Sequence, residues 1–336
     1  MKRRSRFSTG RMLAITLFVA LIGVTTSVDA RKPTRSPPPS QPPICEVSQP
    51  SYVLFLDDYP KGRIQIATLP CLSDSTVDFV SPRELVLDLP RRDRRQFQVA
   101  NGDVFHDGSV RRIVFGGRTG PSDYWAIYEG VIDIEHSTIT QIKPVVNTPF
   151  VREEDPRFSS DGQWIIYKRD GEIWRIYADD PGASPNLYYK ENNCELWAPS
   201  MFANVVSYVR RCASDSNSDR IVYHIEGGQP IILPSAGGGP DRFAHFTQAG
   251  ELVYSHLDTS RDTANLWMYV PGTAPFPLYS ETTSDDDAYA ERDGNEYIAF
   301  SGWGSDRYDL YVYSRARVSA VQLTAGINVL GAVLFD

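Results

Sequence analysis

Hydrophobic residues recur along this chain in short runs that are separated by polar turns. The clearest example lies between residues 155 and 177. An extended stretch ending at Phe158 is followed by Asp161-Gly162, and glycine accepts the positive φ that tight hairpin turns require. The apolar run Trp164–Tyr167 and, after a second turn, the run Glu172–Tyr177 are rich in β-branched and aromatic residues. This pattern predicts three consecutive antiparallel strands.

The same order of short strands and turns recurs along the chain with a period of about 40–60 residues, which is the length of one propeller blade. Further copies cover residues 52–67, 104–128, 197–225, 243–270 and 288–313. We predict an all-β fold with four short strands in each unit and no helix. Counting the units favours a six-bladed β-propeller over one with five or seven blades.

The first and last units of the repeat are both incomplete. No opening strand precedes Tyr52, whereas the apolar run Asn328–Phe335 near the C-terminus has no unit of its own. We therefore predict that the C-terminal strand pairs in the first blade and closes the ring. Such closure leaves few exposed sheet edges.

The segment DPRFSSDGQWIIYKRDGEIWRIY resembles the PD40 repeat, a WD40-like repeat of TolB-like β-propellers. Asp155, Pro156, Phe158 and the Asp161-Gly162 turn match the family pattern, and Ser160 replaces its second proline. The resemblance extends over residues 50–336 and implies a propeller in an exported protein. Residues 31–49 are too few for the additional N-terminal domain of TolB. The resemblance therefore does not imply that this chain shares the role of TolB in the Tol–Pal system.

The first thirty residues have the pattern of a secretory signal peptide. Basic residues precede the apolar run Met12–Val24, and Ala30 lies at the expected cleavage point. The run is shorter than the roughly 20 residues of a membrane-spanning helix, so we expect no membrane insertion after cleavage. Residues 31–49 are proline-rich and predict an extended linker. The propeller domain then covers residues 50–336.

Charge and cysteine content narrow the choice of partners and compartment. The leader carries five of the 34 basic residues and one of the 42 acidic residues, so the mature chain has a charge of about −12. A chain this acidic is a poor binder of nucleic acid. In an exported chain four cysteines should be oxidised; of the three possible pairings we favour Cys45–Cys71 and Cys194–Cys212. The expected location is the periplasm or the extracellular medium.

No catalytic, cofactor or metal motif is present in the sequence. His245 and His256 are predicted on neighbouring strands of one hairpin, as diagonal neighbours if Ala249-Gly250 forms the turn; packing is favoured over a metal pair. Acidic runs at 57–58 and 285–287 are interpreted as solvated turns rather than calcium ligands. Trp303 and Arg307 lie in a predicted glycine-rich loop, where an aromatic residue can mark a contact surface. We predict Trp303, Arg307, His245 and His256 as a possible contact surface.

These observations favour a monomeric, exported, non-catalytic propeller that binds or scaffolds a protein or an envelope polysaccharide and uses no cofactor. The alternative is a carbohydrate-active enzyme, a lyase or glycosidase, whose site lies in the central channel. Carboxylates from different blades could converge there, and sequence spacing does not show such convergence. The fold alone does not decide between the two functions.

Overall fold

The computed structural model describes residues 49–336 except 58–61, 73–78, 95, 181, 215–218, 236–238, 261–262, 281–284, 291–293 and 304–306; the side chains of 92, 285–287 and 290 are also not described. The predicted leader and most of the predicted linker therefore lie outside the described residues. Within the described part, no helix combines the length and the apolar character needed to cross a bilayer.

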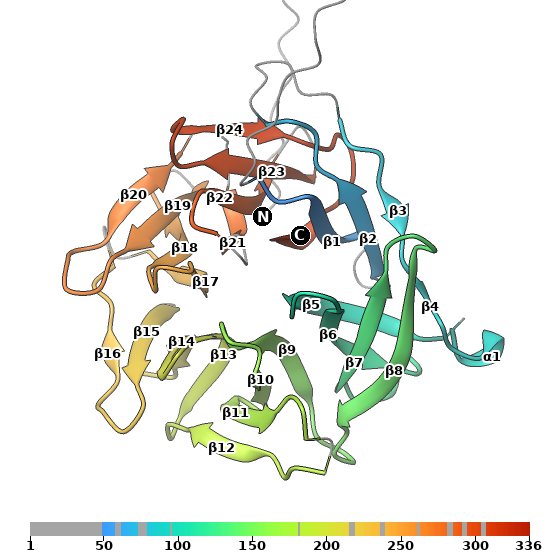
Figure 1. The fold of residues 1–336 in the computed structure, drawn as a ribbon. Coiled ribbons are helices and arrows are strands. Elements are labelled where there is room, and N and C mark those ends of the chain that lie inside the picture. The colour runs from blue at the N-terminus through green and yellow to red at the C-terminus, as the bar shows by residue number, and fades with distance from the viewer. Residues whose placement is uncertain are drawn as a thin grey trace, which may run out of the picture. The chain divides into compact units, whose positions relative to one another are not determined.

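The strands form six small sheets arranged in a ring, as Figure 1 shows. The first blade, from its innermost strand outward, is β25 (Leu330–Phe335), β1 (Tyr52–Asp57), β2 (Arg63–Thr68) and β3 (Arg83–Glu84). The second is β5 (Gln98–His106), β6 (Arg111–Arg118), β7 (Ala126–Asp133), β8 (Thr138–Val146) and an added outer strand β4 (Val86–Leu87). The third is β9 (Glu153–Phe158), β10 (Trp164–Arg169), β11 (Glu172–Tyr177) and β12 (Asn186–Tyr189).

The remaining three blades repeat the same order from the channel to the rim. The fourth blade is β13 (Cys194–Phe202), β14 (Val205–Cys212), β15 (Arg220–Ile225) and β16 (Ile231–Ile232). The fifth is β17 (Asp241–Phe246), β18 (Leu252–Asp258), β19 (Thr263–Tyr269) and β20 (Phe276–Tyr279). The sixth is β21 (Asp285–Ala290), β22 (Tyr297–Trp303), β23 (Tyr308–Ser314) and β24 (Ser319–Gln322). The predicted six-bladed all-β fold is confirmed.

The ring is closed by the C-terminal strand, as the sequence predicts. Strand β25 pairs antiparallel with β1, from Tyr52 opposite Phe335 to Leu56 opposite Leu330. Val333, Leu334 and Phe335 are all buried. The two ends of the described chain thus meet in one sheet (Figure 1).

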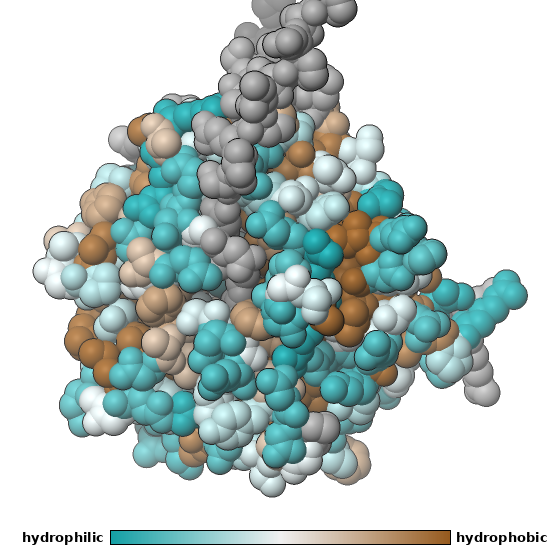
Figure 2. Space-filling view, in the orientation of Figure 1, coloured by the Kyte–Doolittle hydropathy of each residue, from teal (hydrophilic) through white to brown (hydrophobic). Residues whose placement is uncertain are grey.

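The hydrophobic core is divided among the six boundaries between neighbouring blades. Five of six clusters take residues from two adjacent sheets, and the cluster between the first and second blades also includes Tyr289 of the sixth. Leu54 and Val333 of the first blade, for example, pack with Val104 and Ile113 of the second. On the face drawn in Figure 2 most residues are hydrophilic, and hydrophobic residues gather beside β2 and β3. Each blade therefore depends on both neighbours for burial of its apolar side chains.

Two local features differ from the prediction. A four-residue helix, α1 (Arg91–Arg94), follows the first blade, although the sequence predicts no helix. Strand β4, which precedes this helix, pairs in parallel with β8 and covers the outer edge of the second blade. The turn at Gly162 has the predicted positive φ of 69°. In the fourth blade the corresponding turn is Ala203-Asn204, where Ala203 has a φ of 50°.

Candidate binding site in the central channel

The innermost strands share a bulge that recurs around the ring. A non-glycine residue has a positive φ in four of them: Asn101 in β5, Asp155 in β9, Ala198 in β13 and Phe243 in β17. Gly331 takes this conformation in β25. The pairing register of these strands shifts at the same places. A bulge re-aims the residues that follow it.

A pocket in the channel is lined by one residue from every innermost strand, namely Asp103, Arg157, Ser200, His245, Tyr289 and Val333. Five of them lie two positions after the bulges described above, and Tyr289 follows a register shift in β21. Five of these six side chains are polar. From Arg157 onward they recur every 43 to 45 residues, at the same position of each repeat. The repeat therefore places a ring of hydrogen-bonding groups around the channel.

Two blades on opposite sides of the ring meet across the channel. The Arg157 guanidinium of the third blade donates to the Tyr289 hydroxyl of the sixth and lies 4.4 Å from the centre of its ring. The His245 ring of the fifth blade stacks on Tyr289, with ring centres 3.9 Å apart and planes 21° apart. Arg157 also donates to the Gly102 carbonyl at 2.5 Å. These contacts bridge the channel.

Hydrogen bonds between blades hold the bulges in place. The Asp155 carboxylate accepts from the Asn101 side-chain amide at 2.5 Å and from the Ala198 backbone N–H at 3.3 Å. Asp155 thus links the bulges of three successive blades. The Asp103 carboxylate accepts from the Val104 N–H and the Phe158 N–H, both at 2.9 Å. Both Asp103 oxygens are used in this way, so this carboxylate holds the wall together.

The pocket lies toward one end of the ring. It is lined by Phe158, Phe202 and Phe246, which are the last residues of β9, β13 and β17. We call this end, where the innermost strands finish, the exit end. The opposite end, where Glu153, Cys194 and Asp241 begin the same strands, is the entry face. Ser160, Thr247 and Gln248 extend the polar lining at the exit end.

The structure separates the two histidines of the predicted contact surface. His245 lies in the channel wall, opposite Val253, whereas His256 lies opposite Asp241 near the entry face. Their predicted diagonal placement is wrong because the hairpin loop has three residues rather than two, as the Thr247 N–H donates to the Glu251 carbonyl at 2.9 Å. This shifts the pairing register by one residue, so the two histidines lie on opposite faces of the sheet. The His256 ring nitrogen Nδ1 lies 2.7 Å from a buried Asp241 oxygen.

Trp303 and Arg307 lie at the entry end of the sixth blade. Trp303 is the last residue of β22 rather than a loop residue, because the ladder continues to the Trp303–Tyr308 pair. The two rings are perpendicular with centres 4.9 Å apart. Arg307 is exposed and donates to the Gly326 carbonyl at 2.8 Å. The four predicted contact residues therefore do not form one surface, and a contact role of Trp303 and Arg307 stays a prediction.

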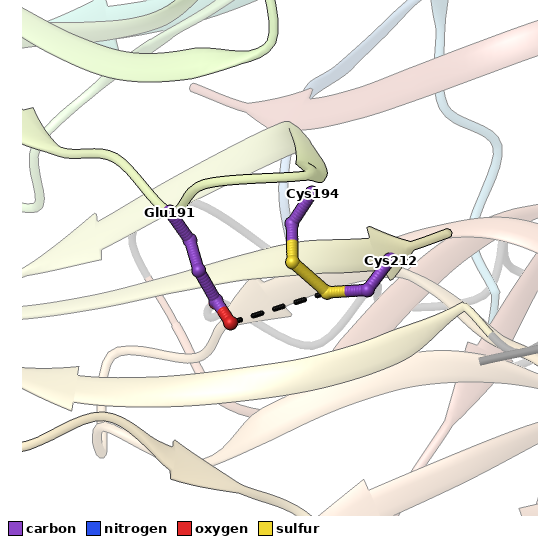
Figure 3. Close-up of side chains that lie close together, drawn as sticks. All are labelled: Glu191, Cys194 and Cys212. Atoms are coloured by element: carbon purple, nitrogen blue, oxygen red, sulfur yellow. Dashed lines mark hydrogen bonds between the residues drawn. A yellow bond between two sulfur atoms is a disulfide. The ribbon is translucent and has the colours of Figure 1, made fainter. Parts of the chain in front are cut away.

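The structure contains the predicted Cys194–Cys212 disulfide, which joins the first residue of β13 to the last of β14. Cys71 is also disulfide-bonded, and its predicted partner Cys45 lies outside the described residues. Figure 3 shows Glu191 beside the Cys194–Cys212 bond, with its oxygen 4.0 Å from the Cys212 sulfur. These three form the one potential metal-binding group found within the described part of the chain. Because both sulfurs are in the disulfide and Glu191 pairs with Arg210 at 2.6 Å, they do not resemble a metal site.

Sequence reasoning missed Asp103, Arg157 and Tyr289 as wall residues. Arg157 lies inside the segment that matches the repeat pattern, and that pattern predicts a fold but no wall position. Aligning all six repeats on the bulge would have placed the wall residues in one column. No common residue type marks the bulge, since asparagine, aspartate, alanine, phenylalanine and glycine all occur there.

No known family model matches the sequence, and no curated protein matches it significantly. Solved structures do resemble the fold. TolB from Acinetobacter baumannii superposes with a TM-score of 0.59 and 12% identity, over 84% of this chain and 66% of that one. A putative TolB from Agrobacterium tumefaciens gives a TM-score of 0.54 and 13% identity, over 84% of this chain and 91% of that one. Hydrazine synthase from Kuenenia stuttgartiensis gives 0.60 and 11%, over 84% and 46%.

The comparisons therefore show a TolB-like six-bladed propeller fold. The chain spans about two thirds of the first TolB protein and under half of hydrazine synthase. The assignment of the repeat to the PD40 family stays a prediction. Because similar propellers occur in proteins with different names and activities, the function has to be argued from the site.

Proposed function

We propose that this protein is an exported binding propeller that holds its partner at the exit end of the channel without transforming it. The observation that supports this proposal most is the ring of wall residues: six innermost strands each contribute one side chain, and five of these are polar. Hydrogen-bond donors and acceptors that converge on one concave site suit recognition of a polar group. The pocket has room for only about 40 Å³, so it would receive one group of a partner that rests on the exit end.

The wall is held in place before any ligand arrives. Arg157 and Tyr289 contact each other across the channel, and Asp155 links three bulges. A pre-ordered wall lowers the entropy lost on binding. Asp103 has both oxygens engaged by backbone N–H groups, which suits a structural carboxylate better than a proton donor in glycoside cleavage. These contacts favour binding over the carbohydrate-active alternative.

Export of the chain explains its disulfide bond. The Cys194–Cys212 disulfide is expected in an oxidising compartment. Together with the predicted leader over residues 1–30, it supports a periplasmic or secreted location. The partner in such a setting is a protein or an envelope polysaccharide, and we propose that the propeller binds it as a monomer.

The channel site can be tested by obstructing it. Gln248 lines the pocket at the exit end, and Gln248→Trp would place an indole across its opening. Gln229→Trp, on an exposed turn at the rim, is the matched control. Both variants and the wild type would be immobilised and exposed to periplasmic extract and to a glycan array, after their melting temperatures are shown to agree.

We expect one set of species bound by the wild type and by Gln229→Trp and lost with Gln248→Trp. Unchanged binding by Gln248→Trp would contradict the channel site. Shortening of a captured polysaccharide during incubation, measured by mass spectrometry, would contradict the non-catalytic function and support the enzymatic alternative.

A further inference from the structure

A second site lies on the entry face, between the fourth and fifth blades. There a cleft of about 870 Å³ is lined by Cys194 and Glu195 at the start of β13, Arg211 at the end of β14, Arg242 in β17 and Leu257 in β18. The cleft shares no lining residue with the channel pocket. It is therefore independent of the proposed channel function.

A buried aspartate fixes two arginines in the wall of this cleft. The Asp219 side chain is 2% exposed and binds Arg211 through two bonds, from Nε at 2.6 Å and from Nη2 at 2.9 Å. The same carboxylate accepts from Arg242 Nε at 2.7 Å. These hydrogen bonds to Asp219 raise the pKa of the Arg211 guanidinium. Two permanently charged, planar groups are thus held in defined positions.

Asp219 binds Nε and Nη2 of Arg211 and Nε of Arg242. The outer nitrogens, Nη1 of Arg211 and both Nη atoms of Arg242, are left for a ligand. The side chains of Arg211 and Arg242 are 48% and 40% exposed. Arg211 Nη1 lies 4.0 Å from a Glu195 oxygen, which exceeds hydrogen-bond distance. For Arg242, the described residues place no acceptor on Nη1 or Nη2. The cleft therefore offers a fork of donors suited to an oxyanion.

The backbone segments next to the cleft are closely packed. A Cβ atom at Gly239 would lie 1.7 Å from the Leu257 carbonyl oxygen, so only glycine allows this close approach. The Gly239 carbonyl accepts from Arg220 Nη1 at 2.6 Å, and the Leu257 N–H donates to the Pro240 carbonyl at 2.9 Å. The Cys194–Cys212 disulfide holds the strand end next to Arg211.

The negative charge of Glu195 in the cleft wall limits the kind of anion that can bind. Glu195 is half-exposed, and its hydrogen bond from Lys168 at 2.7 Å lowers the pKa of its carboxyl group, which stays ionised. This negative charge would repel a densely charged polyanion. A single carboxylate next to apolar groups is better matched, because Pro240 and Leu257 also line the cleft.

We propose that this cleft binds a carboxylate of an acidic peptide segment, held between Arg211 and Arg242. The carboxylate accepts from the outer nitrogens of the two arginines, and neighbouring apolar side chains of the peptide pack on Leu257 and Pro240. The partner is thus a protein that presents aspartate, glutamate or a free C-terminus within an otherwise weakly charged segment.

The test uses an array of hexapeptides with free or blocked C-termini, incubated with the full chain. The variant Arg242→Gln removes the fork and leaves Asp219 paired with Arg211, and Arg83→Gln on the exposed strand β3 is the matched control. We expect the wild type and the control to retain peptides enriched in carboxylates. Arg242→Gln should lose this enrichment and bind the best peptide about tenfold more weakly in fluorescence anisotropy.

Further variants and ligands keep the test decisive. Should Arg242→Gln fail to fold, Arg242→Lys keeps the charge but not the planar fork, and should weaken binding in the same assay. Asp219→Asn should weaken binding as well, since it removes the charge and one of the two acceptor oxygens that hold both arginines. Equal binding of acidic peptides and their amide counterparts would overturn the proposal. Tighter binding of trigalacturonate or inorganic phosphate than of the best peptide would also overturn it.

Discussion

The channel pocket and the entry-face cleft are assembled in opposite ways. The pocket takes one wall residue from each of six blades, from Asp103 to Val333. The cleft is built from residues 193–259 of two successive blades. Formation of the pocket therefore requires closure of the whole ring, whereas the cleft needs only one boundary between neighbouring sheets.

The difference also appears in how each site is held together. Across the channel, side chains of different blades contact one another, as Arg157 does with Tyr289. In the cleft one buried carboxylate, Asp219, positions both arginines. A site that depends on many distant segments is sensitive to the global fold, and a local site is sensitive to single substitutions. The following predictions test this contrast.

Deleting Ile327–Asp336 should have the largest effect, because it removes β25 and reopens the ring. Burial of Val333, Leu334 and Phe335 contributes about 5–9 kcal/mol, and most of this loss falls on the first blade. We expect hydrogen exchange to increase first in β1, which loses its partner strand, and less in β14 and β17 around the cleft. Mass-spectrometric hydrogen exchange of the truncated and full chains would measure this.

The control for this deletion is removal of Asp336 alone. Its carboxylate accepts from the Ser51 N–H and hydroxyl, both at 3.1 Å, and its carbonyl accepts from Arg111 Nε at 2.7 Å. All three bonds are exposed, so we expect a change of about 1 kcal/mol or less. Equal loss of protection in all six blades of the truncated chain would show that the cleft depends on ring closure as much as the pocket does.

The fold could be read from the sequence far better than either site. Strand runs, turns and the missing first strand are local signals, and they are sufficient for six blades and for closure by Asn328–Phe335. The wall residues depend on register: one additional residue in the Thr247–Glu251 hairpin loop was enough to misplace His256 relative to His245. Bulges at Ala198 and Phe243 leave no signal, because neither residue favours a positive φ. The cleft was missed because Arg211, Asp219 and Arg242 lie on three separate segments.

Asp155→Ala should have an intermediate effect, centred on the channel. It removes the acceptors for Asn101 and Ala198 and leaves alanine with a φ of 53°, a conformation that aspartate tolerates better. We expect a loss of about 1–3 kcal/mol in the free energy of unfolding by urea. Asp155→Asn, which keeps one acceptor and the positive φ, should lose less. Equal losses for both variants would show that these bonds do not support the wall.

The smallest effect should be a shift in the pKa of Glu195, which lines the cleft. Lys168 lowers the pKa of Glu195 mainly through the hydrogen bond between them. A carboxyl group whose pKa is lowered on folding stabilises the protein above its unfolded pKa of about 4.3. This contribution is lost as the pH falls through the lower folded value. Because Glu195 is 46% exposed, the contribution should stay below about 1 kcal/mol. Lys168→Met should raise the pKa of Glu195 in a carboxyl carbon NMR titration, whereas Lys143→Met on the second blade should not. An unchanged pKa of Glu195 in Lys168→Met would show that the nearby Arg211 and Arg152, rather than Lys168, lower it.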